Sequence, residues 1–185
     1  MKRVVLVGAT DGLGRALAAE YASRGCWVTI LGRSPQKLGA LVAELSARHP
    51  AATVRGVVCD LADAGRIEPA FREAIEASGH CDLFLYNAGL MPAGDGVTSD
   101  PESDAATMNV NAVAAVRMLG LAANYFRAAR RGHLAAISSI AGDRGRKVSD
   151  ARVAKLYAPF GARAGLAFWL DVTRDWHEEK ERLWP

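Results

Sequence analysis

Three glycines near the N-terminus have the spacing of a phosphate-binding turn. Gly8, Gly12 and Gly14 lie between an apolar, β-branched segment and a segment with apolar residues at helical spacing. Glycine at such a turn lets the backbone approach a pyrophosphate closely, and the next helix offers free N–H groups and the positive end of its dipole. This context predicts a dinucleotide site, and a tight turn that only packs well is the alternative.

The end of the next apolar segment bears on which dinucleotide binds. A carboxylate there would hold a free ribose 2′-hydroxyl and repel a 2′-phosphate. The chain instead reads Leu31-Gly32-Arg33-Ser34, and the Arg33 guanidinium can make charge-assisted bonds to a phosphate. The sequence therefore favours NADP(H) over NAD(H), with Asp11 in the glycine loop as a counter-argument.

Strands and helices must alternate to bring these residues to one edge of a sheet. Strands are expected within residues 3–10, 26–33, 52–63, 81–89 and 132–139, and helices within 12–25, 34–50, 64–79 and 104–131. The strand segments are apolar throughout, which is typical of parallel strands that helices cover on both faces. The chain is therefore predicted to be an α/β protein with a doubly wound parallel sheet, three layers (α/β/α) and strand order 3-2-1-4-5.

The composition narrows the function classes. Of the 185 residues, 50% are hydrophobic and 23% are charged, the net charge is +3, and Lys and Arg form no dense tract, so we expect no nucleic-acid partner. The odd count of cysteines, Cys26, Cys59 and Cys81, argues against a disulfide framework and a metal site. We find no leader and no segment that is long and apolar enough to span a membrane, and therefore expect a cytoplasmic protein.

The order of the short motifs resembles the short-chain dehydrogenase/reductase family, whose NAD(P)-binding domain has the Rossmann fold. After the glycine turn come Asp60-Leu61, Asn87-Ala88-Gly89, Asn109-Val110-Asn111 and Ser138-Ser139, over roughly residues 3–146. The resemblance implies an oxidoreductase that transfers a hydride between a nicotinamide cofactor and a small-molecule carbonyl or alcohol substrate. It places the cofactor contacts at Gly8, Thr10, Asp11, Gly12, Leu13, Gly14, Arg33, Asp60, Leu61, Asn87, Ala88 and Gly89.

The resemblance also implies a role for each polar residue of these motifs. Asp60 would bond the adenine amino group, and Asn87 with the two residues after it would support the central sheet beside the adenine ribose. Asn111 would hold a water of the proton relay, and Ser139 would polarise the substrate oxygen. The structural alternatives are a strand-end cap, a turn residue, a helix kink and a strand-end hydroxyl, respectively.

The family's catalytic tyrosine, with a lysine four residues later, has no counterpart at the expected positions. That spacing places both groups on the same cleft, where the lysine lowers the pKa of the tyrosine. Counting from Ser139 leads to Arg152 and Leu156. A second alignment, with one residue lost, leads to Phe160 and Arg163. Neither pair can move a proton as the family pair does.

Tyr157 is therefore the candidate acid, in a displaced position, and the catalytic set is Asn111, Ser139 and Tyr157. The alternative is a catalytically impaired protein that binds a nucleotide or regulates a partner. We expect a single domain over 1–185, with a family-like core over 1–147 and a divergent, C-terminally short helical tail over 148–185. A stripe through Trp169 and Trp176 in that tail predicts a homo-oligomer, a dimer or a tetramer, and packing of the stripe on the fifth strand of the same chain is the alternative.

Overall fold

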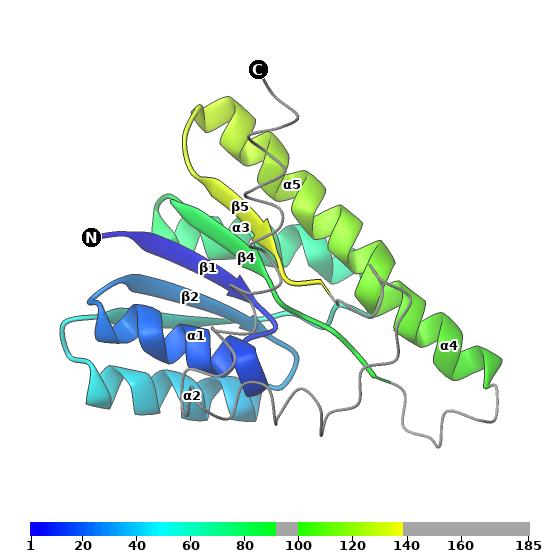
Figure 1. Cartoon of the computed structure of the whole chain (residues 1–185), viewed down its shortest axis with the longest axis horizontal. Helices are drawn as coiled ribbons and strands as arrows, with labels where there is room; N and C mark the ends of the chain where they lie inside the picture. The colour runs from blue at the N-terminus through cyan, green and yellow to red at the C-terminus, as the bar shows by residue number, and fades with distance from the viewer. Residues whose placement is uncertain (92–99, 139–185) are drawn as a thin grey trace, which may run out of the picture. The chain divides into compact units, whose positions relative to one another are not determined.

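The structure is a computed structural model of the chain, and residues 1–91 and 100–138 are described. The candidate catalytic residues Ser139 and Tyr157, and the stripe through Trp169 and Trp176, lie outside the described residues. Met1–Ile137 forms one compact unit, whose strands and helices are labelled in Figure 1. The single domain over 1–185 stays a prediction.

Strands and helices alternate along the described part of the chain, as predicted. The strands are β1 (Arg3–Val7), β2 (Trp27–Gly32), β3 (Thr53–Val58), β4 (Leu83–Tyr86) and β5 (His133–Ala136). The helices are α1 (Gly12–Ser23), α2 (Pro35–Arg48), α3 (Ala64–Ser78) and a long helix made of α4 (Pro101–Met108), the π-helical turn η1 (Asn109–Val113) and α5 (Ala114–Ala129). All strand pairs are parallel and their order is β3-β2-β1-β4-β5, which confirms the doubly wound α/β fold.

Helices cover both faces of the sheet, and β1 lies at its centre (Figure 1). Val4 and Leu6 of β1 belong to the core beneath α1 and α2, whereas Val5 and Val7 belong to the core beneath α3 and α5. These four side chains are at most 1% exposed, because successive strand residues point to opposite faces. Burial on both faces explains why the β1 segment is apolar without interruption.

The first two helices begin and end as the sequence predicts. Ser34 caps α2 by accepting the Lys37 N–H, and Pro35 occupies the first turn, where its missing N–H costs nothing. Asp11 caps α1 by accepting the Gly12 N–H at 2.9 Å. Gly25 follows the C-cap of α1 with a φ of 68°, a conformation that glycine adopts without strain.

The long helix differs from the prediction at its start and in its middle. It begins at Pro101 rather than at Asp104, because the side chain of Asp100 accepts the Ser103 N–H and caps it. It also contains the π-helical turn η1, which a periodicity of 3.6 residues does not reveal.

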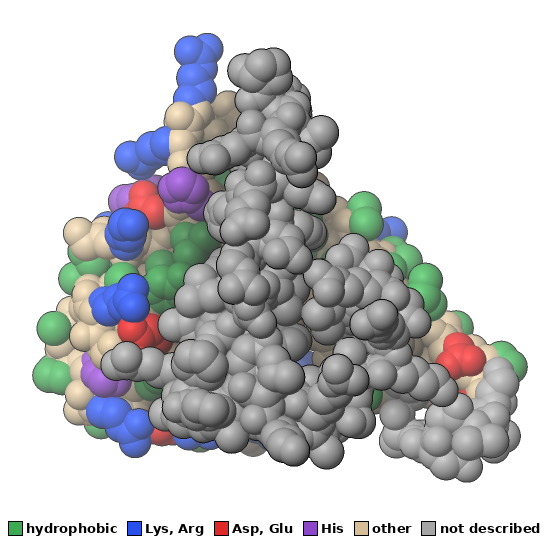
Figure 2. Space-filling model, in the orientation of Figure 1, with side chains coloured by type: hydrophobic (Ala, Val, Ile, Leu, Met, Phe, Trp, Pro, Cys, Tyr) green, Lys and Arg blue, Asp and Glu red, His purple; other side chains and the backbone are tan. Residues whose placement is uncertain are grey.

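The outer face of the long helix is apolar and exposed. Val116 is 73% exposed and Met108 is 61% exposed, and Figure 2 shows hydrophobic side chains along this side of the molecule. By length and composition alone, Pro101–Ala129 qualifies as a membrane-spanning helix, as core helices of soluble proteins also do. The prediction that no segment is long and apolar enough to span a membrane is therefore wrong. The helix passes this test because Arg117 is the single charged residue between Asp104 and Arg127.

Candidate functional site

The register of the sheet brings the strand ends together at one edge. Val7 of β1 lies beside Leu31 of β2 and Tyr86 of β4. The chain leaves the sheet just after these residues, at the point where the strand order reverses. The Gly8 N–H donates to the Leu31 carbonyl at 3.0 Å, and the Asn87 N–H donates to the Val7 carbonyl at 2.9 Å. Ligands of doubly wound sheets bind at such a switch point.

The three glycines of the turn have different structural roles. A Cβ atom on Gly8 would overlap the backbone of Ala88, and a Cβ atom on Gly14 would overlap the Gly8 carbonyl. These two glycines therefore allow close packing of backbone on backbone. A Cβ atom on Gly12, whose φ is 50°, would meet nothing within 4 Å. Gly12 thus leaves space open at the N-terminus of α1, an end of the helix whose N–H groups can bind an anion.

A cleft with a volume of about 640 Å³ lies along this edge. Every predicted cofactor contact except Gly14 lines it, together with Val7, Leu31, Gly32, Ser34, Lys37, Cys59, Leu90 and Val110. Gly14 lies buried behind the turn instead. The sequence motifs, which are up to 81 residues apart, from Gly8 to Gly89, therefore form one site.

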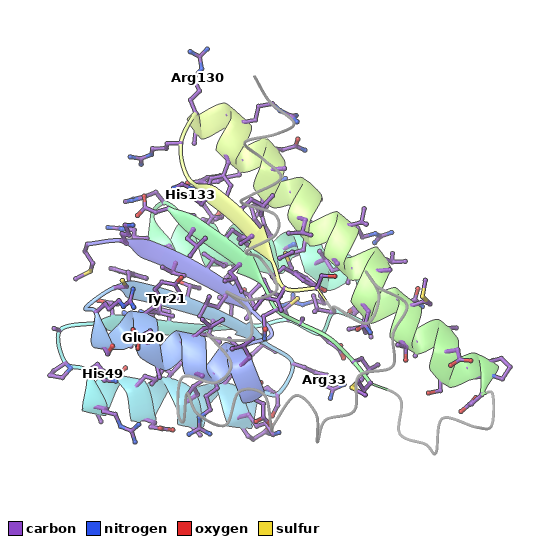
Figure 3. All side chains as sticks on the ribbon, viewed as in Figure 1. Glu20, Tyr21, Arg33, His49, Arg130 and His133 are labelled. Atoms are coloured by element: carbon purple, nitrogen blue, oxygen red, sulfur yellow. The ribbon has the colours of Figure 1, made fainter. Side chains whose placement is uncertain are left out.

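Arg33 gives the cleft a positive charge at the end of β2. Figure 3 shows it at the carboxyl end of the sheet, whereas Arg130 and His133 lie at the opposite end. Arg33 is exposed, and it forms no hydrogen bond or ion pair with any described residue. Its five N–H donors are therefore available to an anionic group in this part of the cleft.

An ion pair lies across the same end of the cleft. The ammonium nitrogen of Lys37, in the first turn of α2, is 3.3 Å from a carboxylate oxygen of Asp11. The other Asp11 oxygen accepts the Gly12 N–H. The Gly12 N–H and then the Lys37 ammonium lower the pKa of Asp11 below its usual 3.8, because both stabilise the carboxylate.

Asp60 and Asn87 also make contacts with the backbone around the cleft. One carboxylate oxygen of Asp60 accepts the Ala62 N–H at 3.0 Å, which is the strand-end cap that we considered as an alternative. The side-chain amide of Asn87 donates to the Gly8 carbonyl at 2.9 Å. Asn87 therefore links the end of β4 to the glycine turn, and its place beside the adenine ribose stays a prediction.

Asn111 contacts the backbone beside the cleft rather than standing free in it. Its amide oxygen accepts the Leu90 N–H at 2.6 Å, and its amide nitrogen donates to the Leu90 carbonyl at 2.8 Å. Both hydrogen bonds fix the π-helical turn against the segment that follows β4. The side chain is thus engaged with the backbone of Leu90, and the role of Asn111 in a proton relay stays a prediction.

Tyr86 stabilises the same turn from the end of β4. Its hydroxyl donates to the Val110 carbonyl at 3.1 Å, and burial raises the pKa of Tyr86 to about 12. Burial likewise raises the pKa of the neighbouring Cys59 thiol to about 11. Neither group can act as an acid or a base near neutral pH, so both belong to the structure of the cleft.

The described residues place the predicted cofactor contacts in one cleft and place Asn111 beside it. Ser139 and Tyr157 lie outside the described residues, so their relation to the cleft stays a prediction. Sequence reasoning gave Ser34 only a capping role and did not consider Lys37 at all. Their position in the first turn of the helix after β2 was the available signal, because that turn adjoins the carboxyl edge of the sheet.

A family model described as short chain dehydrogenase matches residues 2–152. The chain belongs to the short-chain dehydrogenase family. It is 36% identical over 143 residues to dehydrogenase/reductase SDR family member 7B of Bos taurus, which covers 75% of the chain and 44% of that protein. It is 30% identical over 144 residues to an uncharacterized oxidoreductase of Mycobacterium tuberculosis, and this match covers 78% of the chain and 57% of that protein. The chain thus spans about half the length of these relatives.

Solved structures of this family share the fold. A short-chain dehydrogenase from Sphingobium yanoikuyae in complex with NADPH gives a TM-score of 0.70 at 23% identity, over 79% of this chain and 57% of that one. A short chain dehydrogenase from Burkholderia cenocepacia in complex with NADP gives a TM-score of 0.68 at 27% identity. The match covers 94% of this chain and 68% of that one. The likeness shows that this short-chain dehydrogenase has the fold of these structures.

Proposed function

We propose that this short-chain dehydrogenase binds NADP(H) and transfers a hydride to or from a small carbonyl or alcohol substrate. The observation that carries the proposal is the cleft itself. It combines open space at Gly12, the Arg33 guanidinium at the end of β2, which pairs with no described residue, and the Asp60 carboxylate after β3. The structural relatives in complex with NADPH and NADP support the same ligand.

Each end of the cleft fits a different part of the dinucleotide. The backbone at Gly12 and Leu13 would face the pyrophosphate, since the first N–H groups of a helix bind anions. Arg33 would bind the ribose 2′-phosphate, and Asp60 would accept a bond from the adenine amino group. Asn87 would keep the glycine turn in place through its hydrogen bond to the Gly8 carbonyl.

The chemistry needs a proton donor from this chain. When bound, NADPH supplies a hydride to the carbonyl carbon, and the carbonyl electron pair moves onto the oxygen. Ser139 would polarise that oxygen and Tyr157 would protonate it. A tyrosine without a neighbouring cation has a pKa of about 10, so it can donate a proton but is a poor base at neutral pH. We therefore propose slow reduction and an alkaline optimum for the reverse oxidation.

A second candidate function rests on one feature of the sequence. None of the four tyrosines is followed four residues later by a lysine, since those positions are Gly25, Leu90, Ala129 and Gly161. The spacing that lets a lysine assist a tyrosine is thus missing. The second candidate is a nucleotide-binding or regulatory protein that keeps the cleft without turnover.

NADPH oxidation over a panel of ketones separates the two candidates. Slow turnover in the parent chain, lost in both Ser139→Ala and Tyr157→Phe, is the result expected for the oxidoreductase. NADPH binding without turnover on any ketone would favour the second candidate. Turnover that survives Tyr157→Phe would overturn the assignment of Tyr157 and require another acid.

The remaining proposals concern assembly and location. We propose a homo-oligomer, for which the exposed apolar side chains of Met108, Val113 and Val116 give support, beside the predicted stripe through Trp169 and Trp176. A monomer in light scattering at high concentration would contradict it. The three buried free thiols support the proposed cytoplasmic location, since reducing compartments preserve them.

A further inference from the structure

The Asp11–Lys37 ion pair lies in the cleft, where the phosphate of a bound cofactor would compete with Asp11 for the Lys37 ammonium. Asp11 belongs to the glycine loop on one wall of the cleft, and Lys37 belongs to α2 on the other. Among the ion pairs formed by described residues, it is the one whose two members both line the cleft. Arg33 and Ser34 line the same end.

The position of Lys37 on α2 is fixed by local structure. It lies in the first turn, and its backbone N–H donates to the hydroxyl of Ser34, the capping residue that follows Arg33. The neighbouring pair of Arg15 on α1 and Glu44 on α2, with a 2.6 Å contact, links the two helices. The Lys37 side chain therefore starts from a defined point within reach of both Asp11 and the end of β2.

Charge decides which partner Lys37 prefers when a phosphate is present. A phosphate monoester carries about two negative charges near neutral pH, whereas Asp11 carries one. The side chain of Lys37 is 64% exposed and that of Asp11 is 80% exposed, so their contact is weak and readily exchanged. A lysine ammonium on its flexible stem can turn from one acceptor to another, which a rigid guanidinium does less easily.

We propose that Lys37 is a specificity-determining residue that binds the 2′-phosphate of NADP(H) beside Arg33 and pairs with Asp11 when no phosphate is present. The inference rests on the proposed cofactor site. It explains how a cleft with an acidic residue in its glycine loop accepts the more negative of the two dinucleotides. Asp11 then opposes the 2′-phosphate, and Lys37 offsets that repulsion.

Fluorescence titration of the full chain with NADPH and with NADH tests the inference. Lys37→Gln should weaken NADPH binding about threefold and leave NADH binding unchanged, since only NADPH has the 2′-phosphate. Lys37→Arg keeps the charge and should keep most of the preference. Lys2→Gln is the matched control: it removes the same charge at the start of β1, at the opposite edge of the sheet, and should change neither affinity.

Asp11→Asn separates direct binding by Lys37 from simple neutralisation of Asp11. The single variant should bind NADPH more tightly, because one negative charge near the phosphate is gone. If Lys37 contacts the phosphate, Lys37→Gln still weakens NADPH binding in the Asp11→Asn background. If Lys37 acts only through Asp11, it has no effect there, and the proposal is overturned.

The NADH titration distinguishes failure of this inference from failure of the proposed function. A parent chain that binds both dinucleotides, with the same NADPH-to-NADH ratio in Lys37→Gln, overturns the role of Lys37 alone. A parent chain that binds neither dinucleotide overturns the cofactor site, and the role of Lys37 with it. An NADPH preference that falls in Lys37→Gln but not in Lys2→Gln supports both.

Discussion

The two sides of the cleft are held in place by different kinds of contact. On the side of β1 and β2, the strands are almost fully buried, and backbone hydrogen bonds such as Gly8 to Leu31 join the strand ends. On the side of β4 and the long helix, side chains provide the links: Tyr86 to Val110 and Asn111 to Leu90. After the proposed function, we name the side of β1 and β2 the nucleotide side and the side of β4 and the long helix the catalytic side. The first depends on glycine positions, whereas the second depends on a few polar side chains.

Substitutions in the glycine turn should have the largest effects on the nucleotide side. Gly14→Val would push a side chain into the Gly8 carbonyl, and we expect a loss of about 3 kcal/mol in the free energy of unfolding. Gly12→Val should instead abolish NADPH binding, because the side chain would fill the open space at the N-terminus of α1. Its cost in stability should be about 1–2 kcal/mol, from the positive φ.

Chemical denaturation and NADPH titration of both variants check this separation. If Gly12→Val stays folded and still binds NADPH, the cofactor lies elsewhere. If Gly14→Val is as stable as the parent chain, the nucleotide side does not depend on close backbone packing.

On the catalytic side, removing one hydroxyl should have a smaller effect. Tyr86→Phe loses the hydrogen bond to the Val110 carbonyl, and we expect a decrease of about 1 kcal/mol in the free energy of unfolding. Tyr21→Phe is the control, because the Tyr21 hydroxyl has no hydrogen bond among the described residues. Equal stability of the two variants in urea denaturation would show that side-chain bonds do not hold η1 in place.

Alkaline pH should gradually lower the free energy of unfolding, because three buried groups, Cys59, Cys81 and Tyr86, must then ionise. Burial raises the pKa of Cys59 to about 11 and the pKa values of Cys81 and Tyr86 to about 12. In the unfolded chain these groups have their ordinary pKa values, 9.0 for the thiols and 10.0 for the phenol. The stabilisation is therefore complete below pH 9 and is lost as pH rises toward 11–12, because the folded state then binds more protons than the unfolded state.

Urea denaturation at a series of pH values measures this slope. Cys81→Ala removes one of the groups and should make the slope smaller between pH 9 and 12. A free energy of unfolding that stays constant across this range would contradict the burial of the three groups.

The fold and the nucleotide side could be predicted from the sequence because their signals are local. The apolar strand segments, the Ser34 cap and the glycine spacing each act within a few residues, and the structure confirms the sheet order that they imply. The catalytic side could not be derived in the same way. Its π-helical turn depends on contacts of Asn111 and Tyr86 with residues 21 and 24 positions away in the chain.

The contact of Lys37 with Asp11 could not be predicted from the sequence for a related reason. Lysine in the first turn of a helix is ordinarily a solvated charge, and only the fold shows that it faces Asp11 across a cleft. The resemblance to a family supplied Asn87 and Asp60 as candidates, but not the contacts that they make. A motif thus identifies residues, whereas distance and burial define their roles.

We expect Arg33 to bind the 2′-phosphate of NADP(H) on the nucleotide side of the cleft. Equilibrium titration of the parent chain and of Arg33→Ala with NADPH and NADH, at one fixed ionic strength, is the decisive measurement. The parent should bind NADPH about tenfold more tightly than NADH, and Arg33→Ala should lose most of this preference while its NADH affinity stays nearly the same. Equal affinities in the parent chain, or tighter binding of NADH, would contradict it.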